Sequence, residues 1–252
     1  MRAASSCALL AMGCVTAALA LPATSSEDPS ASYRAAVVQF APARVPNRTL
    51  THAEAYHLQM ANVDRMSTWM AAAKANGSQI VIFPESAIGS CPGDTCGDEG
   101  WTRDSIVPFL EAIPEPTSPP TVLCDDPAAA LHAPVSAKLS CLARQHRIVA
   151  VFDLGDVQTC EAAPVAGGCR ADGRAQFNTA VAFDSDGALL EKYHKHHLFK
   201  EEGWFDVDAD LTKKGRFEAF GVKFGLFICY DIEFEREEPH DGQENASFCA
   251  IL

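Results

Sequence analysis

The sequence has 252 residues, and 48% of them are hydrophobic, which is enough material for one domain with a sizeable buried core. Its 33 acidic residues outnumber the 20 basic ones, giving a formal net charge of −13 at pH 7. A surface this acidic repels phosphate backbones, and the sequence holds no basic patch with interleaved aromatic residues, which argues against nucleic acid as a partner.

The first twenty residues have the pattern of a secretory signal peptide. Arg2 supplies their only charge, an uncharged stretch rich in Ala and Leu follows, and Ala18-Leu19-Ala20 resembles a cleavage site. We therefore expect residues 1–20 to be removed and the protein to be secreted. The alternative is an N-terminal membrane anchor, but the apolar run is short and leads into polar residues. No later stretch is long and apolar enough to predict a transmembrane segment.

The first elements of the mature chain alternate between strands and a helix. Residues 33–41 form an apolar run ended by Pro42, which predicts a strand. Apolar side chains then recur at helical spacing from about Ala53 until Gly77, which predicts a core-facing helix. Residues 79–83 are expected to form a buried strand.

The middle of the chain is less regular. Residues 91–134 include "PEPTSPP", which can sustain neither a helix nor a strand ladder, so we predict a long loop with one short helix. Residues 134–147 have helical spacing, and residues 148–155 form another apolar strand pattern. The Gly- and Cys-rich stretch 156–174 is predicted to be a loop.

Two hairpins are predicted in the last third of the chain. The first spans residues 177–195, with its turn at residues 184–187, "DSDG", which tolerate positive φ. The second runs from residue 216 through Val222-Lys223 into "FGLFICYD". Strands alternating with helices and interrupted by hairpins predict an α/β protein with a mixed sheet.

Ten cysteines occur, and Cys7 and Cys14 lie in the predicted signal peptide. An oxidising compartment favours pairing, and short spacings suggest three local disulfides. The candidate pairs are Cys91 with Cys96, Cys124 with Cys141, and Cys160 with Cys169. This leaves Cys229 and Cys249, which could themselves be bridged. Three sequons make Asn47, Asn76 and Asn245 candidate glycosylation sites.

Three polar residues end or follow apolar strands, where a cleft can form at the rim of a sheet. They are Glu85 in "IVIFPES", Lys195 in "KYHKHHLF" and Cys229 in "GLFICYD". A charged residue after a strand is usually only solvated, so the three residues gain weight from their combination.

These three motifs, in this order, resemble the glutamate, lysine and cysteine motifs of the nitrilase superfamily of carbon–nitrogen hydrolases. The text between them, including "LSCLARQHRIVAVFDLGD" and "FNTAVAFDSDGALLEKYHKHHLF", is most similar to the vanin (pantetheinase) and biotinidase branch. The resemblance covers about residues 33–238, so we expect a hydrolase domain over residues 31–238. It implies a four-layer αββα sandwich, incomplete at its C-terminal end.

The resemblance also implies a role for each site residue. Cys229 would attack the amide carbonyl, Glu85 would act as base and acid, and Lys195 would stabilise the thiolate and the oxyanion. The backbone N–H of Tyr230 would help to bind the oxyanion. A second glutamate after the lysine motif would hold Lys195, and its best match is Glu202, with Glu201 as the alternative. The implied substrate is a small linear amide such as pantetheine or a biotinyl amide, with no metal and no organic cofactor.

Two other readings use the same residues. His194, His196 and His197 could be zinc ligands, but alternation along a strand would place them on different faces. Cys229 could also form a Cys-His-Asp arrangement with one of these histidines and Asp231.

The end of the chain departs from the family pattern. The sequence stops 23 residues after Cys229, whereas members of the superfamily continue with further strands and helices. Residues 239–252 show no strand or helix period and are expected to be an atypical tail. We therefore expect a truncated chain whose strand 224–229 has an unpaired edge, and the alternative function is a catalytically silent secreted fragment that binds a ligand or partner. The terminal "CAIL" matches a prenylation box, which a signal peptide excludes.

Overall fold

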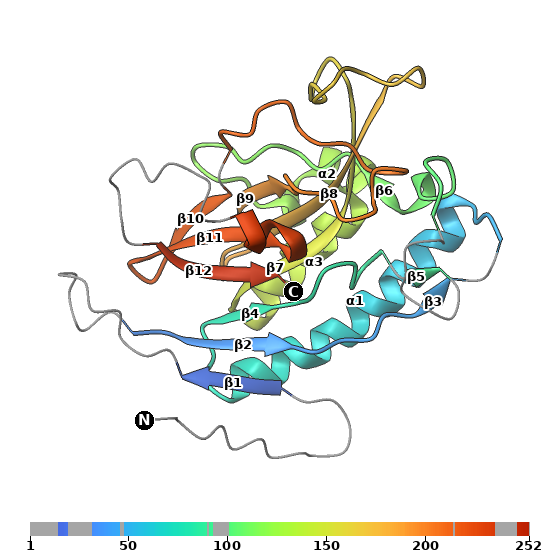
Figure 1. Ribbon diagram of the computed structural model, residues 1–252. Helices are drawn as coiled ribbons and strands as arrows, with labels where there is room; N and C mark the ends of the chain where they lie inside the picture. Colours follow the sequence, from blue (N-terminus) through green and yellow to red (C-terminus); the bar gives the residue numbers. More distant parts are fainter. Residues whose placement is uncertain are drawn as a thin grey trace.

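The computed structural model describes residues 15–19, 32–45, 48–89, 91–92, 101–213, 215–234 and 246–251. A seven-stranded sheet lies at its centre, with the strand order β1-β2-β4-β7-β8-β9 and with β6 beside β7 (Figure 1). The strands β2, β4 and β7 are parallel, whereas β7, β8 and β9 are antiparallel. The bounds are β1 Val15–Leu19, β2 Arg34–Val38, β4 Ile80–Ile82, β6 Leu110–Glu111, β7 Val149–Thr159, β8 Arg174–Phe183 and β9 Leu189–His194.

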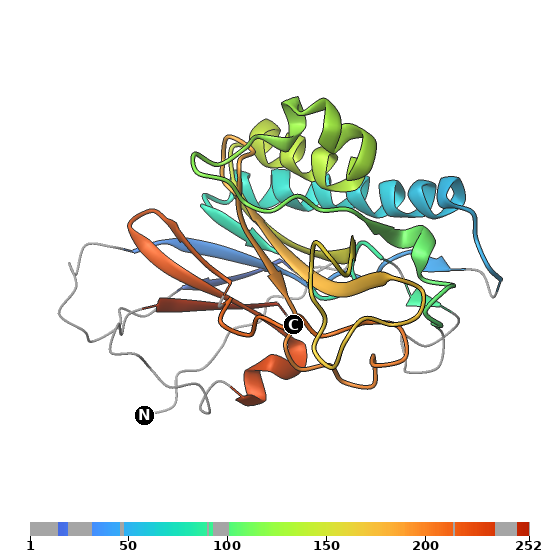
Figure 2. The ribbon, with the colours of Figure 1, turned by 90° about the horizontal axis from the view of Figure 1, so that it is seen from above.

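Helices cover one face of this sheet (Figure 2). Helix α1 begins with a capping box, in which the Thr51 hydroxyl accepts from the backbone N–H of Glu54 and the Glu54 carboxylate accepts from that of Thr51. The buried Glu111 carboxylate of β6 accepts from the backbone N–H groups of Val135 and Ser136 and so caps α3. The helices and 3₁₀ turns are α1 His52–Ala75, η1 Val107–Phe109, η2 Leu123–Asp125, α2 Pro127–His132 and α3 Pro134–His146.

A second sheet of three strands packs on the opposite face of the central sheet (Figure 2). It consists of β10 Arg216–Ala219, β11 Val222–Ile228 and β12 Ala246–Ile251, and η3 Cys229–Phe234 follows β11 directly. The described residues thus form the layers helix, sheet, sheet of the expected αββα sandwich, and no second layer of helices occurs among them. A small pair, β3 Arg44–Val45 and β5 Cys91–Pro92, lies apart.

Side chains of the central strands alternate between the two apolar layers. Ala150 and Phe152 of β7 pack toward the helices, whereas Val149 and Val151 pack toward β11. The second layer contains Phe224, Leu226 and Ile228 of β11, all of them buried. Because the alternation continues along each strand, it decides which polar residues beyond the core face the three-stranded sheet.

The predicted strands, helices and hairpins occur in the predicted order, but the predicted loop 91–134 also contains the short strand β6, which pairs with β7. Two further details are corrected. Strand β7 continues to Thr159 because it stays paired with β8 over its whole length, so the predicted loop 156–174 is shorter. The tail expected to lack structure contributes β12, which pairs with β11 from Lys223 to Ile228. Strand β11 therefore has neighbours on both edges, and the expected unpaired edge is wrong.

Several expectations concern modification and targeting. The structure contains the disulfides Cys124–Cys141 and Cys160–Cys169, whereas Cys96 lies outside the described residues. Asn76 is exposed at the end of α1, whereas Asn47 and Asn245 also lie outside the described residues. Part of the expected signal peptide forms β1, antiparallel to β2. Within the described ranges, no helix combines the length and apolar character needed to cross a membrane.

Candidate active site

The site lies where β7 changes its neighbour. Strand β4 pairs with β7 only from Val149 to Val151, and β6 takes its place at Gly155. Between these two pairings the chain leaves β4 through Pro84 and brings Glu85 to the open edge of β7. Such a switch of neighbours leaves room for a ligand in an α/β sheet.

Lys195 follows the last residue of β9 and is buried, with a side-chain exposure of 1%. Its backbone N–H donates to the carbonyl of Asn178, which continues the antiparallel ladder by one residue. Its Nζ lies 2.7 Å from Glu85 Oε1 and 2.7 Å from Glu201 Oε2. Burial opposes the charge on Lys195, but the two carboxylates outweigh it and raise the pKa of the ammonium group.

Asn178 of β8 completes this cluster, and the sequence analysis did not single it out. Its Nδ2 donates to Glu85 Oε1 at 2.8 Å and to Glu201 Oε1 at 2.9 Å. The amide thereby fixes both carboxylates around Lys195. The available signal was a polar residue on a strand face that is otherwise apolar, since alternation places Asn178 on the same face as Ala180 and Ala182.

Cys229 is contributed by the other sheet. It follows β11 as the first residue of η3 and has φ of 46°, a left-handed conformation that is unfavourable for a residue with a Cβ atom. Its side chain is exposed, and among the cysteines that the structure describes it is the free one. Partial burial and the nearby Glu85 carboxylate raise the pKa of the thiol, against the opposing effect of Lys195.

Asp231 fixes the turn that carries Cys229. Its buried carboxylate accepts hydrogen bonds from Tyr193 Oη at 2.9 Å, from the backbone N–H of His197 at 2.8 Å and from that of Ile228 at 3.1 Å. Tyr193 and His197 flank Lys195 in sequence, so this single carboxylate ties the cysteine turn to the lysine segment. The backbone N–H of Tyr230 comes directly after Cys229, at the start of η3.

The structure corrects the choice between two adjacent glutamates. Glu201 contacts both Lys195 and Asn178, and burial raises the pKa of its carboxyl group against the effect of Lys195. Glu202 is exposed, and its backbone carbonyl accepts a hydrogen bond from Arg170. The carboxylate that meets Lys195 is therefore Glu201, not Glu202.

This arrangement predicts different effects for the two positions. Glu201→Gln should lower amide turnover by about 10- to 100-fold, because the charge that orients Lys195 is lost and the single amide oxygen cannot accept from both Lys195 and Asn178. Glu202→Gln is the matched control and should change turnover by less than about twofold, as expected for an exposed side chain. Steady-state rates of the two purified variants, compared with their melting temperatures, test this. A larger loss in Glu202→Gln would contradict the assignment.

The three histidines take other places, and the ring of His196 packs against that of Tyr193 with their centroids 4.9 Å apart. His194 is buried, with Nδ1 3.0 Å from Asp208 Oδ2 and Nε2 3.0 Å from Asp156 Oδ2. His197 Nδ1 lies 3.0 Å from Asp231 Oδ1, and its ring stacks on Phe234. No metal-binding group of His, Cys, Asp and Glu side chains is found in the described part of the chain. His197 does form a pair with Asp231, but the residues that line the cavity with Cys229 include Glu85 and Lys195 and not His197.

The His194 cluster predicts a loss of stability in acid. Burial alone would raise the pKa of Asp208, but the hydrogen bonds from His194 and from the backbone of Asp210, together with the charge of Lys213, outweigh it and hold the pKa well below the usual 3.8. A carboxyl group with a depressed folded-state pKa stabilises the protein above its unfolded pKa, and this contribution is lost as the pH falls through the folded value. We expect the urea concentration at the unfolding midpoint to decrease as the pH is lowered below about 4. His194→Gln should make this decrease with pH smaller. A decrease equal to that of the native protein would contradict the prediction.

A cavity of about 430 Å³ opens between the central sheet and the cysteine turn. Glu85, Lys195 and Cys229 lie on its wall together with Asp153, Asn178 and Glu201. The rest of the wall is largely aromatic and aliphatic: Phe40, Trp101, Ile106, Phe109, Leu110, Phe199, Trp204 and Phe205. The cavity therefore combines one compact charged cluster with an apolar surface that suits an uncharged organic group.

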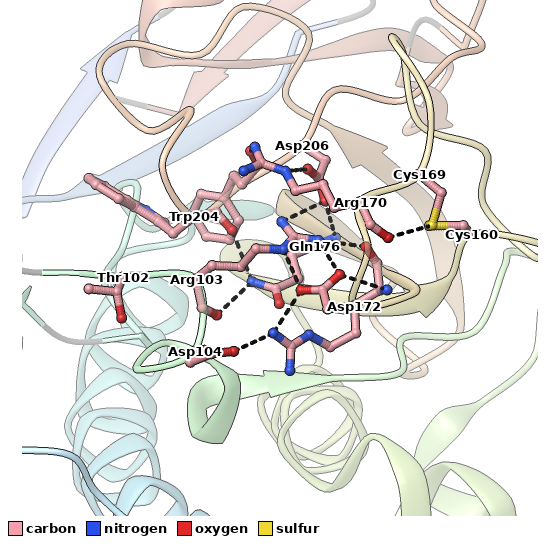
Figure 3. A network of polar contacts seen from close by, with 12 residues as sticks. Thr102, Arg103, Asp104, Cys160, Cys169, Arg170, Asp172, Gln176, Trp204 and Asp206 are labelled. Atoms are coloured by element: carbon pink, nitrogen blue, oxygen red, sulfur yellow. Dashed lines mark hydrogen bonds and ion pairs between the residues drawn. A yellow bond between two sulfur atoms is a disulfide. The ribbon is translucent and has the colours of Figure 1, made fainter.

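A network of charged and polar side chains supports the aromatic wall (Figure 3). Arg103 binds Asp172 at 2.6 Å and Asp206 at 2.9 Å, and Arg170 binds the other oxygen of Asp206 at 2.8 Å. Gln176 donates from Nε2 to the carbonyl of Trp204 at 2.9 Å. Since Arg170 follows Cys169, the Cys160–Cys169 disulfide loop and the Trp204 segment are joined by this network.

Comparison with known proteins gives consistent matches. The sequence pattern of the family described as carbon–nitrogen hydrolase matches residues 34–237. A pantetheinase of Canis lupus familiaris is 36% identical over 211 residues, which are 81% of this chain and 38% of that protein. A biotinidase of Mus musculus is 34% identical over 230 residues, which are 90% of this chain and 42% of that protein. The chain thus spans about two fifths of the length of these relatives. Among solved structures, an amidase from Nesterenkonia sp. aligns with a TM-score of 0.47 and 20% identity over 80% of this chain and 57% of that chain.

Proposed function

Since the chain belongs to the carbon–nitrogen hydrolase family, we propose that it hydrolyses a linear amide bond of a small substrate through a thioester on Cys229. The observation that carries this proposal is that Glu85, Lys195 and Cys229 line one cavity, with Lys195 Nζ in contact with Glu85 Oε1. A base, a cation and a free thiol thereby face the same space. This set matches the needs of acyl transfer from an amide.

The raised pKa of Cys229 indicates how the first step runs. The thiol is protonated at rest, so Glu85 takes its proton as the sulfur attacks the carbonyl carbon. The C–S bond forms, the carbonyl π electrons move to oxygen, and an oxyanion results. When the oxyanion collapses, the C–N bond breaks and Glu85 gives its proton to the leaving amine.

The second half of the cycle returns the enzyme to its starting state. Water replaces the amine, Glu85 removes a proton from it, and the resulting hydroxide attacks the thioester carbon. The C–S bond then breaks, Glu85 returns the proton to the sulfur, and a carboxylic acid leaves. Lys195 and the backbone N–H of Tyr230 are proposed to stabilise the oxyanion in both halves, while Glu201 and Asn178 hold Lys195 and Glu85 in place.

The proposed substrates are pantetheine and biotinyl amides. The names of the relatives suggest both, and the largely apolar cavity wall suits an uncharged acyl group next to the charged cluster. We further propose that residues 1–20 direct the chain to the secretory pathway, which agrees with the two disulfides.

The test is an assay of the full chain, expressed with its N-terminal segment and collected from the medium. Release of cysteamine from pantetheine, and of the amine from a biotinyl amide, would be measured beside the variant Cys229→Ala as background. Release of either amine above this background supports the hydrolase. A folded, secreted protein that releases neither amine would instead favour the silent binding fragment.

A further inference from the structure

A buried aspartate of β7 lies beside the proposed base and takes no part in the mechanism above. Asp153 is 2% exposed, and its Oδ1 accepts the backbone N–H of Ser86 at 2.7 Å. Its Oδ2 is buried and has no hydrogen-bond partner among the described residues. Alternation along β7 places Asp153 on the same face as Val151, so it continues the buried layer into the cavity that Glu85 lines.

The charges around Asp153 do not balance if every group is ionised. Three carboxyl groups, those of Asp153, Glu85 and Glu201, share one nearby cation, Lys195. Lys195 makes its two short contacts with Glu85 and Glu201, and Asn178 donates to the same two carboxylates. Asp153 receives a single backbone N–H. An ionised carboxylate with one buried oxygen that lacks a donor is strongly disfavoured.

We propose that Asp153 is a positioning residue that carries a proton on Oδ2 at neutral pH and thereby keeps the neighbouring Glu85 ionised. Two adjacent carboxyl groups in a poorly hydrated site hold one proton between them, because both cannot ionise without repulsion. The proton belongs on Asp153, since Glu85 has Lys195 and Asn178 to stabilise its charge and Asp153 has neither. Burial, followed by the charge of Glu85, raises the pKa of Asp153, which agrees with this distribution.

This inference rests on the proposed function and adds a condition to it. Glu85 can remove the proton from Cys229 only while its carboxylate is free. If Asp153 were ionised, repulsion between the two carboxylates would favour a proton on Glu85. Glu85 would then be protonated before the substrate binds and could not act as the base. With Asp153 neutral, Glu85 is the group that exchanges protons with Cys229, the leaving amine and water, and the proton on Asp153 stays in place throughout.

The first experiment is infrared spectroscopy of the native chain labelled with ¹³C at the aspartate side-chain carboxyl. At about pH 8.5 most carboxyl groups are ionised, so a protonated C=O band that shifts with the aspartate label identifies a buried acidic aspartate. We expect this band in the native protein and its loss in Asp153→Asn. The variant Asp206→Asn is the matched control, because Asp206 is equally buried but paired with two arginines, and it should keep the band. Absence of a label-sensitive band in the native chain would overturn the proposal without any variant.

The second experiment measures the pH dependence of Cys229 alkylation by iodoacetamide, read by mass spectrometry of the Cys229 peptide. Glu85→Gln removes a negative charge that raises the pKa of Cys229 and should lower the midpoint by about one unit. Asp153→Asn removes no charge if Asp153 is already neutral and should shift the midpoint by less than about 0.3 units. A downward shift in Asp153→Asn comparable to that in Glu85→Gln would show an ionised Asp153 and overturn the proposal.

Neither measurement depends on turnover. The infrared band and the alkylation midpoint can support the protonation of Asp153 even where no amide is cleaved, in which case the proposed hydrolysis alone fails. Conversely, amide cleavage that requires Cys229, together with a missing band, would retain the proposed function and reject the role of Asp153.

Discussion

Cys229→Ala is expected to lower amide turnover by a factor of about 10⁴ or more, because no other group in the site can form the thioester. The fold should be unaffected, since Cys229 is exposed and its left-handed backbone is held by the contacts of Asp231 with the turn. Turnover is measured as amine release per folded molecule, with the folded fraction taken from a thermal melt. A stable variant with near-normal turnover would eliminate the thioester mechanism.

A paired comparison separates the Glu-Lys-Cys arrangement from a Cys-His-Asp one. Glu85→Gln removes the proposed base and should lower turnover by about 10²- to 10⁴-fold, as expected for loss of general acid–base catalysis. His197→Gln should have a much smaller effect, because His197 bonds to Asp231 and does not line the cavity. The reverse order of effects would assign the proton transfer to His197.

Lys195→Met is expected to have the largest combined effect on turnover and stability. The change keeps the apolar part of the side chain but leaves Glu85 and Glu201 without their shared cation. Removing one partner of a buried ion pair costs about 3–5 kcal/mol of unfolding free energy. Turnover per folded molecule should also fall by about 10³-fold, because positive charge near the oxyanion is lost.

The stability loss in Lys195→Met should depend on pH in a defined direction. Burial already raises the pKa of Glu201 in the native protein, and loss of the cation should raise it further, so the penalty appears above the unfolded pKa and grows as the pH rises. Urea unfolding at several pH values should show the deficit at neutral pH and its decrease toward about pH 4. Lys192→Met is the matched control, because Lys192 is equally buried but contacts Asp156 and Glu115. It should destabilise the fold without a comparable loss of turnover per folded molecule.

The strand-end motifs were sufficient to predict from the sequence that Glu85, Lys195 and Cys229 follow apolar strands, and the structure brings them to one cavity. The choice between Glu201 and Glu202 could not be made in the same way. The segment after β9 has no regular period, so only the path of the loop decides which of two adjacent carboxylates turns inward.

Asn178 and Asp153 show a different limit of prediction from the sequence. Both obey the alternation of a strand, and their apolar neighbours Ala180 and Val151 do face the three-stranded sheet. The sequence alone does not reveal where along a strand the apolar layer ends and a cavity begins. The strand β12 was not predicted for another reason. Residues 246–251 gain their strand conformation from the ladder with β11 and carry little local signal of their own.

The proposed nucleophile, Cys229, and the proposed base, Glu85, follow strands of two different sheets, and an apolar layer that includes Val151 and Leu226 lies between these sheets. The packing of this layer sets the spacing between the two sheets, and the spacing in turn sets the distance between Cys229 and Glu85. Nucleophilic attack tolerates errors of only about an ångström. Heating that loosens this layer should then abolish amide turnover before the strands themselves unfold.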